Sequence, residues 1–282
     1  MITLQELMKE IKNLKPIPAV ANQLLAVVDN PDSSMEDIAN VIQYDPAITA
    51  SVLKTCNSAF FGLKNPAESI KDAVNMLGTD QIIELVLLKS GAKALSGSQK
   101  GYGMESGDMW RYSVSSAVIA KQVAAKFSLK NKNTIFTAAL VKDIGKTILE
   151  NHVSDASKEI KNLVENKGFS FGEAEKKVFG IDHAELGALI GKMWKFSPRM
   201  IKIIRHHHLA DEKMLKDKEV TAVYLADCIC MMMGQGVGSD GLSYRFKAQA
   251  MKELGLCSDD VSMIIAEFGI NIKEVEELLH IV

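Results

Sequence analysis

Hydrophobic residues recur at helical spacing along nearly the whole chain, and turn-forming residues separate the runs. Apolar positions three and four apart, preceded by Ser, Thr, Asp or Pro, indicate helices. No hairpin turn lies between alternating runs, so no strand is expected. The pattern predicts an all-α fold, with helices over residues 3–14, 18–28, 33–43, 45–58, 69–78, 80–95, 108–127, 133–151, 154–167, 171–179, 183–195, 198–208, 218–233, 258–268 and 272–281.

A stretch rich in Gly and Ser, residues 96–107, interrupts this series of helices. Such a composition favours turns and linkers. We therefore predict two parts, an N-terminal helical lobe over residues 1–96 and a helical core with the C-terminal helices over residues 107–282. A second flexible loop is expected over residues 234–241.

The composition is that of a globular protein, with 47% hydrophobic and 24% charged residues among 282. A net charge of −2 provides no attraction for nucleic acid, so no nucleic-acid partner is expected. No apolar run is long enough to span a membrane, and the first fifteen residues lack the apolar segment of a signal peptide. The four cysteines match neither a zinc knuckle nor a redox pair, which favours reduced cysteines and a cytoplasmic location.

An acidic residue stands in the most apolar helical run of the chain. Asp143 shares a predicted helix face with Phe136 and Leu140. A buried carboxylate is unfavourable unless it is paired, hydrogen-bonded or bound to a metal. Lys146 lies three residues on and is the expected partner, whereas Lys142 reaches Asp143 only if its side chain curls back.

A second polar feature opens a helix further along the chain. Asp182 and Glu185 have the spacing of a helix N-cap and its third residue, so His183 is expected in the first turn. Gly187 and Gly191 follow on one face and would let another helix approach closely. A rigidly held imidazole and an ordinary surface histidine fit this position about equally well.

Three consecutive histidines, His206, His207 and His208, end another predicted helix. Histidine is favourable at a helix C-terminus, yet that role does not need three. Adjacent side chains point in different directions, so at most two can face one cavity. Asp227 is again an acid on an apolar stripe, and a hydrogen bond to Tyr224 or a buried base is the simpler explanation for it.

These residues together offer the nitrogen and oxygen ligands that hold zinc or another transition metal. The set consists of Asp143, His183, two of the three consecutive histidines, and Asp227. Each signal alone is weak, and the combination points to a metal site or to what remains of one.

The order of these residues resembles the HD superfamily of metal-dependent phosphohydrolases, in which a first His, a His-Asp pair, further His residues and a late Asp form the site. Residues 143–146, Asp-Ile-Gly-Lys, are similar to the end of the family pattern His-Asp-x-Gly-Lys. Two anchoring histidines are replaced, because Tyr112 stands at the first position and Lys142 at the second. An ammonium at a ligand position repels a cation and can pair with Asp143 instead.

Motifs in the N-terminal half narrow the resemblance to the HDOD domain, the HD-related output domain of bacterial signalling proteins. The motifs are Pro16-Ile17-Pro18, Asp45-Pro46-Ala47-Ile48-Thr49, Asn57-Ser58-Ala59-Phe60-Phe61-Gly62 and Ala73-Val74-Asn75-Met76-Leu77-Gly78. The similarity covers about residues 15–208 and can extend to residue 235. It implies a helical N-terminal lobe packed on a degenerate HD-type helical core.

The resemblance implies a regulatory module that acts through a signalling protein partner, without catalysis and without a cofactor. The expected pocket comprises Tyr112, Lys142, Asp143, Lys146, His183, His207, His208 and Asp227. Alignment with the family's histidine run favours His207 and His208, and a shift by one residue favours His206 and His207.

Two alternatives stay open at this stage. The first is a sensor that keeps the pocket to bind a nucleotide or a metal without turnover. The second is a weakly active phosphohydrolase that holds one Fe, Mn, Ni or Zn ion through Asp143, His183, His207 and Asp227. Lys146 would then polarise the phosphate.

Overall fold

The structure, a computed structural model, describes residues 4–14, 19–28, 30, 32–58, 61, 63–235, 238–239, 241 and 246–270. Within these ranges the chain is helical, and the one β-type contact is an isolated bridge between Gln99 and Met104. The predicted all-α fold is therefore confirmed. Among the same residues, no helix has both the length and the apolar character needed to cross a membrane.

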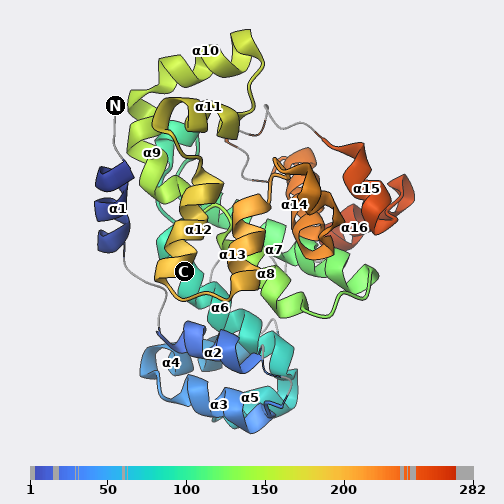
Figure 1. Ribbon diagram of the computed structural model, residues 1–282. Helices are drawn as coiled ribbons and strands as arrows, with labels where there is room; N and C mark the ends of the chain where they lie inside the picture. The colour runs from blue at the N-terminus through green and yellow to red at the C-terminus, as the bar shows by residue number, and fades with distance from the viewer. Residues whose placement is uncertain are drawn as a thin grey trace.

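Four N-terminal helices form a group at one end of the molecule (Figure 1). They are α2 (Ala19–Val28), α3 (Met35–Gln43), α4 (Pro46–Cys56) and α5 (Ile70–Leu77), followed by α6 (Thr79–Leu95), whereas α1 (Leu4–Asn13) lies apart from them. Helices α2 to α5 pack against one another and against α6. Helix α6 also contacts α7 and α8, so it joins this group to the rest of the fold.

Short polar side chains fix the helix ends in this group. Asp45 caps α4 by accepting hydrogen bonds from the amides of Ala47 and Ile48. Asn57 holds the following loop, because its amide group both donates to the carbonyl of Ala67 and accepts from its amide, at 2.9 and 2.7 Å. Phe61 is half-buried against the core. The other motif residues Pro16, Ile17, Pro18, Ala59, Phe60 and Gly62 lie outside the described residues.

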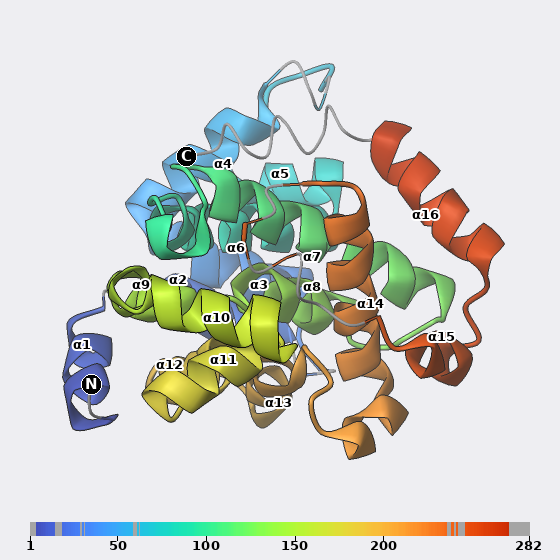
Figure 2. The same ribbon diagram turned by 90° about the horizontal axis from the view of Figure 1, so that it is seen from above.

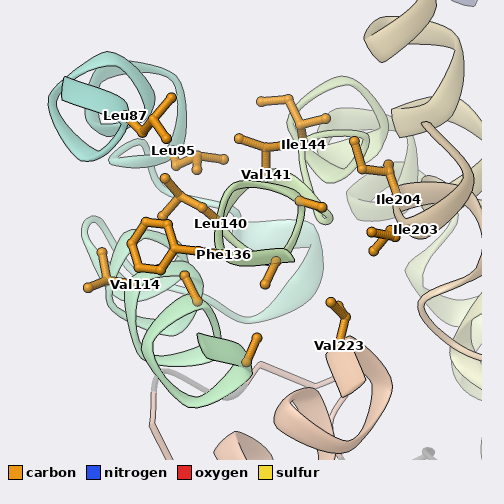
Figure 3. Close-up of a cluster of buried hydrophobic side chains, with 14 of the residues drawn as sticks. Leu87, Leu95, Val114, Phe136, Leu140, Val141, Ile144, Ile203, Ile204 and Val223 are labelled. Carbon is orange, nitrogen blue, oxygen red and sulfur yellow. The ribbon is translucent and has the colours of Figure 1, made fainter. Parts of the chain in front are cut away.

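Helix α8 lies among the core helices and is buried from Thr134 to Val141, with α6, α7, α13 and α14 packed against it. The core helices are α7 (Asp108–Lys126), α8 (Lys132–Val141), α9 (Lys146–Asp155), α10 (Ser157–Lys167), α11 (Phe171–Phe179), α12 (His183–Met193), α13 (Pro198–His206) and α14 (Lys218–Met232). Figure 3 shows Phe136, Leu140 and Val141 of α8 between side chains of α6, α7, α13 and α14. Burial of these apolar side chains is the main source of stability here, at about 25 cal/mol per Å².

The single helix predicted over residues 133–151 is wrong, since the chain turns at residues 142–145 between α8 and α9. Asp143 therefore lies in a turn and not on the stripe of α8. The amide of Lys146 still donates to the carbonyl of Asp143 at 2.8 Å, so the two residues stay close although no continuous helix joins them. The turn contacts α12, as described below.

The Gly- and Ser-rich stretch at residues 96–107 is a folded segment. Its base closes where Gly107 and the Ser106 hydroxyl donate to the carbonyl of Ser96, both at 3.1 Å. Its tip contains the short 3-10 helix η1 (Lys100–Tyr102), which packs on α9. We call residues 96–107 the connector, because it joins α6 to α7.

The two ends of the described chain lie on opposite sides of the core (Figure 2). Helix α1 packs on α9 through the buried side chains of Leu7 and Ile11, although it precedes the N-terminal group in sequence. After α14 come α15 (Ala248–Leu254), which the sequence pattern missed, and α16 (Ser258–Ile270); η2 (Glu212–Lys216) precedes α14. The predicted helix over 272–281 lies outside the described residues, and the division at residues 96–107 stays a prediction.

Candidate functional site

The turn at residues 142–145 is pressed against the first turn of α12. A Cβ on Gly145 would lie 2.0 Å from the carbonyl oxygen of His183 and 2.9 Å from the amide nitrogen of Gly187. A Cβ on Gly187 would lie 3.3 Å from the carbonyl oxygen of Lys142. Glycine at both positions therefore allows two backbones to touch, which is the close approach that the sequence predicts for Gly187. The contact places Asp143 beside His183.

A buried ionic cluster occupies the position of the expected metal. The Lys142 ammonium pairs with Asp143 and lies 2.6 Å from Oδ1 of Asp227. The Lys146 ammonium lies 2.9 Å from Oδ1 of Asp143. All four side chains are 1% exposed, so the pairs are shielded from water. The sequence predicted Lys146 as the partner of Asp143 in preference to Lys142, and the structure places both ammonium groups there.

Tyr112 completes the cluster on the side of α7. Its hydroxyl donates to Oδ1 of Asp227 at 2.6 Å, and its ring lies under the Lys142 ammonium, 4.5 Å from the ring centroid. A cation over an aromatic face is stabilised by the ring quadrupole, more so away from water. The simpler explanation for Asp227, a hydrogen bond to Tyr224 or a pair with a buried base, is confirmed in its second form, since Asp227 pairs with the buried Lys142 ammonium and also accepts from Tyr112.

The charges of the cluster reinforce one another. Burial alone would raise the pKa of Asp143, but the ammonium groups of Lys142 and Lys146 hold it well below its usual range. Burial would likewise lower the pKa of Lys142, and the carboxylates of Asp143 and Asp227 raise it instead. Lys142 therefore stands as a buried cation and, like Lys146, pairs with acids that a metal ion would otherwise balance.

His183 is the first residue of α12, which Asp182 caps by accepting from the amide of Glu185 at 2.7 Å. Its imidazole is fully buried, and its Nδ1 lies 2.6 Å from Oε2 of Glu175. The same oxygen accepts the backbone amide of His183 at 2.9 Å. The interpretation of His183 as an ordinary surface histidine is therefore wrong. Burial opposes the charged form, but the Glu175 carboxylate raises the pKa of His183.

Glu175 and Tyr102 are site residues that the sequence reasoning missed. Glu175 is fully buried on α11, and its Oε1 accepts the Tyr102 hydroxyl at 2.6 Å. The signal for Glu175 was available, since it shares the apolar face of α11 with Phe171 and Val178. An acid on an apolar stripe is the same signal that identified Asp143.

The three consecutive histidines have different places at the end of α13. His207 is fully buried, and its Nδ1 donates to the carbonyl of Ile204 at 2.7 Å. His208 is half-buried, with Nε2 2.7 Å from Nε2 of His183. The pair facing the site is thus His207 and His208, and the half-buried His206 takes no part in these ring contacts.

The protonation of the imidazoles follows from burial and from their neighbours. Burial lowers the pKa of His207 well below its usual range, and the nearby Asp143 only partly opposes this. Burial and the adjacent rings of His207 and His183 do the same to His208. The proton shared by His183 and His208 therefore belongs to His183, which donates to the neutral ring.

The residues fit a metal only in part. The expected ligands Asp143 and Asp227 are both paired with ammonium groups, so the carboxylate half does not fit a cation. In contrast, ligand nitrogens of His183, His207 and His208 lie within 4.8 Å of one another, and the buried Nε2 of His207 has no hydrogen-bond partner. Three imidazoles with an open position are a recognised zinc ligand set.

A cleft connects this histidine cluster to the surface. It has a volume of about 270 Å³, and its lining includes Phe171, Asp182, His208, Tyr224 and Lys247. The ionic cluster lies deeper, among residues that are 1% exposed. A small solute can therefore reach His208 from outside, whereas the ammonium groups are enclosed.

Stability should fall as the pH drops below about 6.5 because His207 is kept neutral in the folded protein. The unfolded chain carries an ordinary histidine, so it binds more protons there and gains up to about 1.4 kcal/mol per pH unit. His208 acts in the same direction. His183 acts in the opposite direction above about pH 6.5, because its raised pKa keeps a proton that the unfolded chain loses there. Well below pH 6.5 it is protonated in both states and adds nothing to the slope. Urea unfolding between pH 7.5 and 5 measures the slope, and His207→Gln should reduce it by about one such increment. An unchanged slope in that variant would contradict the assignment.

The comparisons with known proteins agree with the fold. The model of the HDOD domain family matches residues 14–210. An HDOD domain protein with unknown function from Geobacter sulfurreducens has a TM-score of 0.73 at 24% identity, with 98% of this chain and 95% of that chain covered. A candidate phosphohydrolase from Shewanella amazonensis SB2B has a TM-score of 0.70 at 24% identity, covering 98% of this chain and 97% of that chain.

Two further relatives are longer than this chain. A candidate signal transduction protein from Marinobacter aquaeolei VT8 has a TM-score of 0.76 at 19% identity, with 100% of this chain and 61% of that chain covered. A curated uncharacterized protein from Treponema pallidum (strain Nichols) is 20% identical over 198 residues, which are 70% of this chain and 38% of that protein. The chain thus spans less than two thirds of either relative, and at these identities the solved structures show the fold alone.

Proposed function

This chain belongs to the HDOD domain family, and we propose that it is a non-catalytic signalling module that acts through a protein partner. The match covers most of the chain, including every residue of the site except Asp227. A signalling role is supported by the family and by the name of the Marinobacter aquaeolei structure. A cytoplasmic place is part of the proposal, supported by four free cysteines.

The observation that carries this proposal is the pair of ammonium groups on Asp143. Hydrolysis of a phosphodiester by a metal needs an ion that lowers the pKa of a bound water and polarises the phosphate. Lys142 and Lys146 hold the acid that would bind such an ion, and Tyr112 holds Asp227. An ammonium group, unlike a metal ion, does not lower the pKa of a bound water and so does not turn it into a nucleophile. The cluster therefore preserves the shape of a metal site and supports no metal chemistry at the carboxylates.

The purified protein is accordingly expected not to hydrolyse cyclic dinucleotides or bis-p-nitrophenyl phosphate in the presence of manganese, iron or nickel. The physical reason is that Asp143 and Asp227 already balance internal cations. Turnover that co-purifies with the folded protein and disappears in Asp143→Asn, with the circular dichroism retained, would contradict the proposal.

A matched variant tests whether Tyr112 and Lys142, which replace the two family histidines, are the reason that the site does not bind a metal. Tyr112→His with Lys142→His replaces the aromatic hydroxyl and the ammonium by imidazoles beside Asp143 and Asp227. This variant should bind manganese or nickel more tightly than the parent in equilibrium dialysis, by at least tenfold. Equal affinity in both proteins would remove Lys142 as the cause of the missing metal site.

Binding of a protein partner is tested with the full chain. Signalling proteins from the same bacterium are purified and mixed with it, and complexes are measured by analytical ultracentrifugation. A complex of fixed stoichiometry supports the proposal. Failure of every receiver, cyclase and kinase of the organism to bind would contradict it.

The second candidate function is a sensor, favoured by the cluster of His183, His207 and His208, of which His208 lines the cleft. These residues would hold a zinc-type ion through their imidazole nitrogens once the His183 ring gives up the proton that it donates to His208. Cobalt is a suitable probe, because ligation by three imidazoles gives visible absorption bands. A saturable cobalt spectrum that is lost in His208→Gln supports the sensor. A cobalt spectrum that does not saturate would contradict the sensor and leave the partner-binding module as the one remaining function.

A further inference from the structure

A chain of buried hydrogen bonds leaves the histidine cluster and ends in the connector. The ring of His183 bonds to one oxygen of Glu175, and the hydroxyl of Tyr102 donates to the other, each over 2.6 Å. All three side chains are 0% exposed. A buried carboxylate that is held by donors at both oxygens cannot rotate without losing one of them.

Tyr102 is fixed to the tip of the connector. The connector tip closes on itself where Gln99 pairs with Met104, at 2.9 and 3.0 Å. Its backbone lies directly on α9, since a Cβ on Gly101 would be 2.3 Å from the carbonyl oxygen of Glu150. Movement of the Tyr102 ring therefore has to move this tip.

Ser239, which follows α14, is bonded to the same point. Both the amide and the hydroxyl of Ser239 donate to the carbonyl of Tyr102, at 2.7 and 2.9 Å. Tyr102 at the connector tip thus contacts both Glu175 of the site and Ser239, which follows α14. These segments are 73 and 137 residues apart from Tyr102 in sequence.

We propose that Glu175 and Tyr102 are positioning residues that couple His183 to the connector, so that a change at the histidine cluster alters the connector tip. This coupling rests on the proposed role as a signalling module, because it supplies a route from the pocket to the segment between the helical groups. It needs no ion and no covalent step. A change in the position of the His183 ring shifts Glu175, and Glu175 shifts the Tyr102 hydroxyl.

His207 provides the matched comparison. It is a fully buried imidazole in the same cluster, with its ring centroid 5.7 Å from that of His183. Its Nδ1, however, donates to the carbonyl of Ile204 on its own helix and not to Glu175. General loosening of the cluster would affect the connector equally from either histidine, whereas coupling through Glu175 requires His183.

The test is amide hydrogen exchange on the full chain, with His183→Leu and His207→Leu compared with the parent protein. The amides of Tyr102, Gly103, Met104 and Ser239 report on the connector tip, since each donates a backbone hydrogen bond there. His183→Leu should speed their exchange at least tenfold relative to amides of α3. His207→Leu should change it less than twofold. Equal acceleration by both variants, or none by His183→Leu, would overturn the coupling.

A second experiment, in which Tyr102 is changed and the histidines are observed, tests the coupling even if His183→Leu does not fold. Tyr102→Phe removes only the hydroxyl, and the imidazole resonances of His183 and His207 are then compared by NMR. The resonances of His183 should move and those of His207 should stay. Unmoved His183 resonances would overturn the proposal. A positive exchange result with detectable phosphodiesterase turnover would instead contradict the proposed function and leave the coupling intact.

Discussion

Asp143→Ala is expected to lower the free energy of unfolding by about 3–5 kcal/mol, the usual result of removing one partner from a buried ion pair. Two ammonium groups contact this carboxylate, and the side chains are 1% exposed. After the substitution, Asp227 remains as the nearby acid for both lysines. The loss is measured by urea unfolding at pH 7.5.

A double variant separates charge imbalance from lost packing. Asp143→Ala with Lys146→Met leaves Lys142, Asp227 and Tyr112 as a balanced group, so this protein should be more stable than the single variant. As an external control, Asp260→Asn removes the partly exposed pair with Lys126 and should cost far less stability than Asp143→Ala. A double variant less stable than Asp143→Ala would show that the cluster is not held by charge.

The polar residues of the site were predictable because each violates the apolar pattern around it. Asp143 and Asp227 stand in runs of buried residues, and the structure gives both of them buried cationic partners. The same rule would have found Glu175. It identifies a carboxylate that needs a partner, and it does not identify the partner. For that reason Lys142 could not be chosen from the sequence, since its reach depends on the turn at residues 142–145.

The turn itself was hidden for a related reason. The apolar run continues from Ile135 to Leu149 without a breaker other than Gly145, and glycine within a helical pattern is tolerated. The turn that follows α8 packs against α12, and that contact is a property of the tertiary structure. Tyr102 was equally hidden, because a Gly- and Ser-rich segment predicts a linker and gives no sign that one aromatic side chain enters the core.

Gly145→Ala is expected to destabilise the protein by about 3 kcal/mol or more, although it adds a single methyl group. The Cβ would lie 2.0 Å from the carbonyl oxygen of His183, a distance that two backbones can relieve only by moving apart. Overpacking typically costs about 1–3 kcal/mol, and a clash with the backbone of both His183 and Gly187 lies at or above that range. Separation of the turn from α12 would also draw Asp143 away from His183. Urea unfolding measures the loss, and the His183 imidazole resonances report the displacement.

Gly172→Ala is the matched control for the same chemical change. Gly172 is in the first turn of α11, and a Cβ there would have the side chain of Asp182 at 4.0 Å as its nearest neighbour. Alanine is favoured over glycine in a helix by up to about 1 kcal/mol, so this variant should be as stable as the parent protein or slightly more so. If Gly145→Ala were equally harmless, the turn at residues 142–145 would not be locked against α12. The placement of Asp143 beside the histidine cluster would then lose its physical basis.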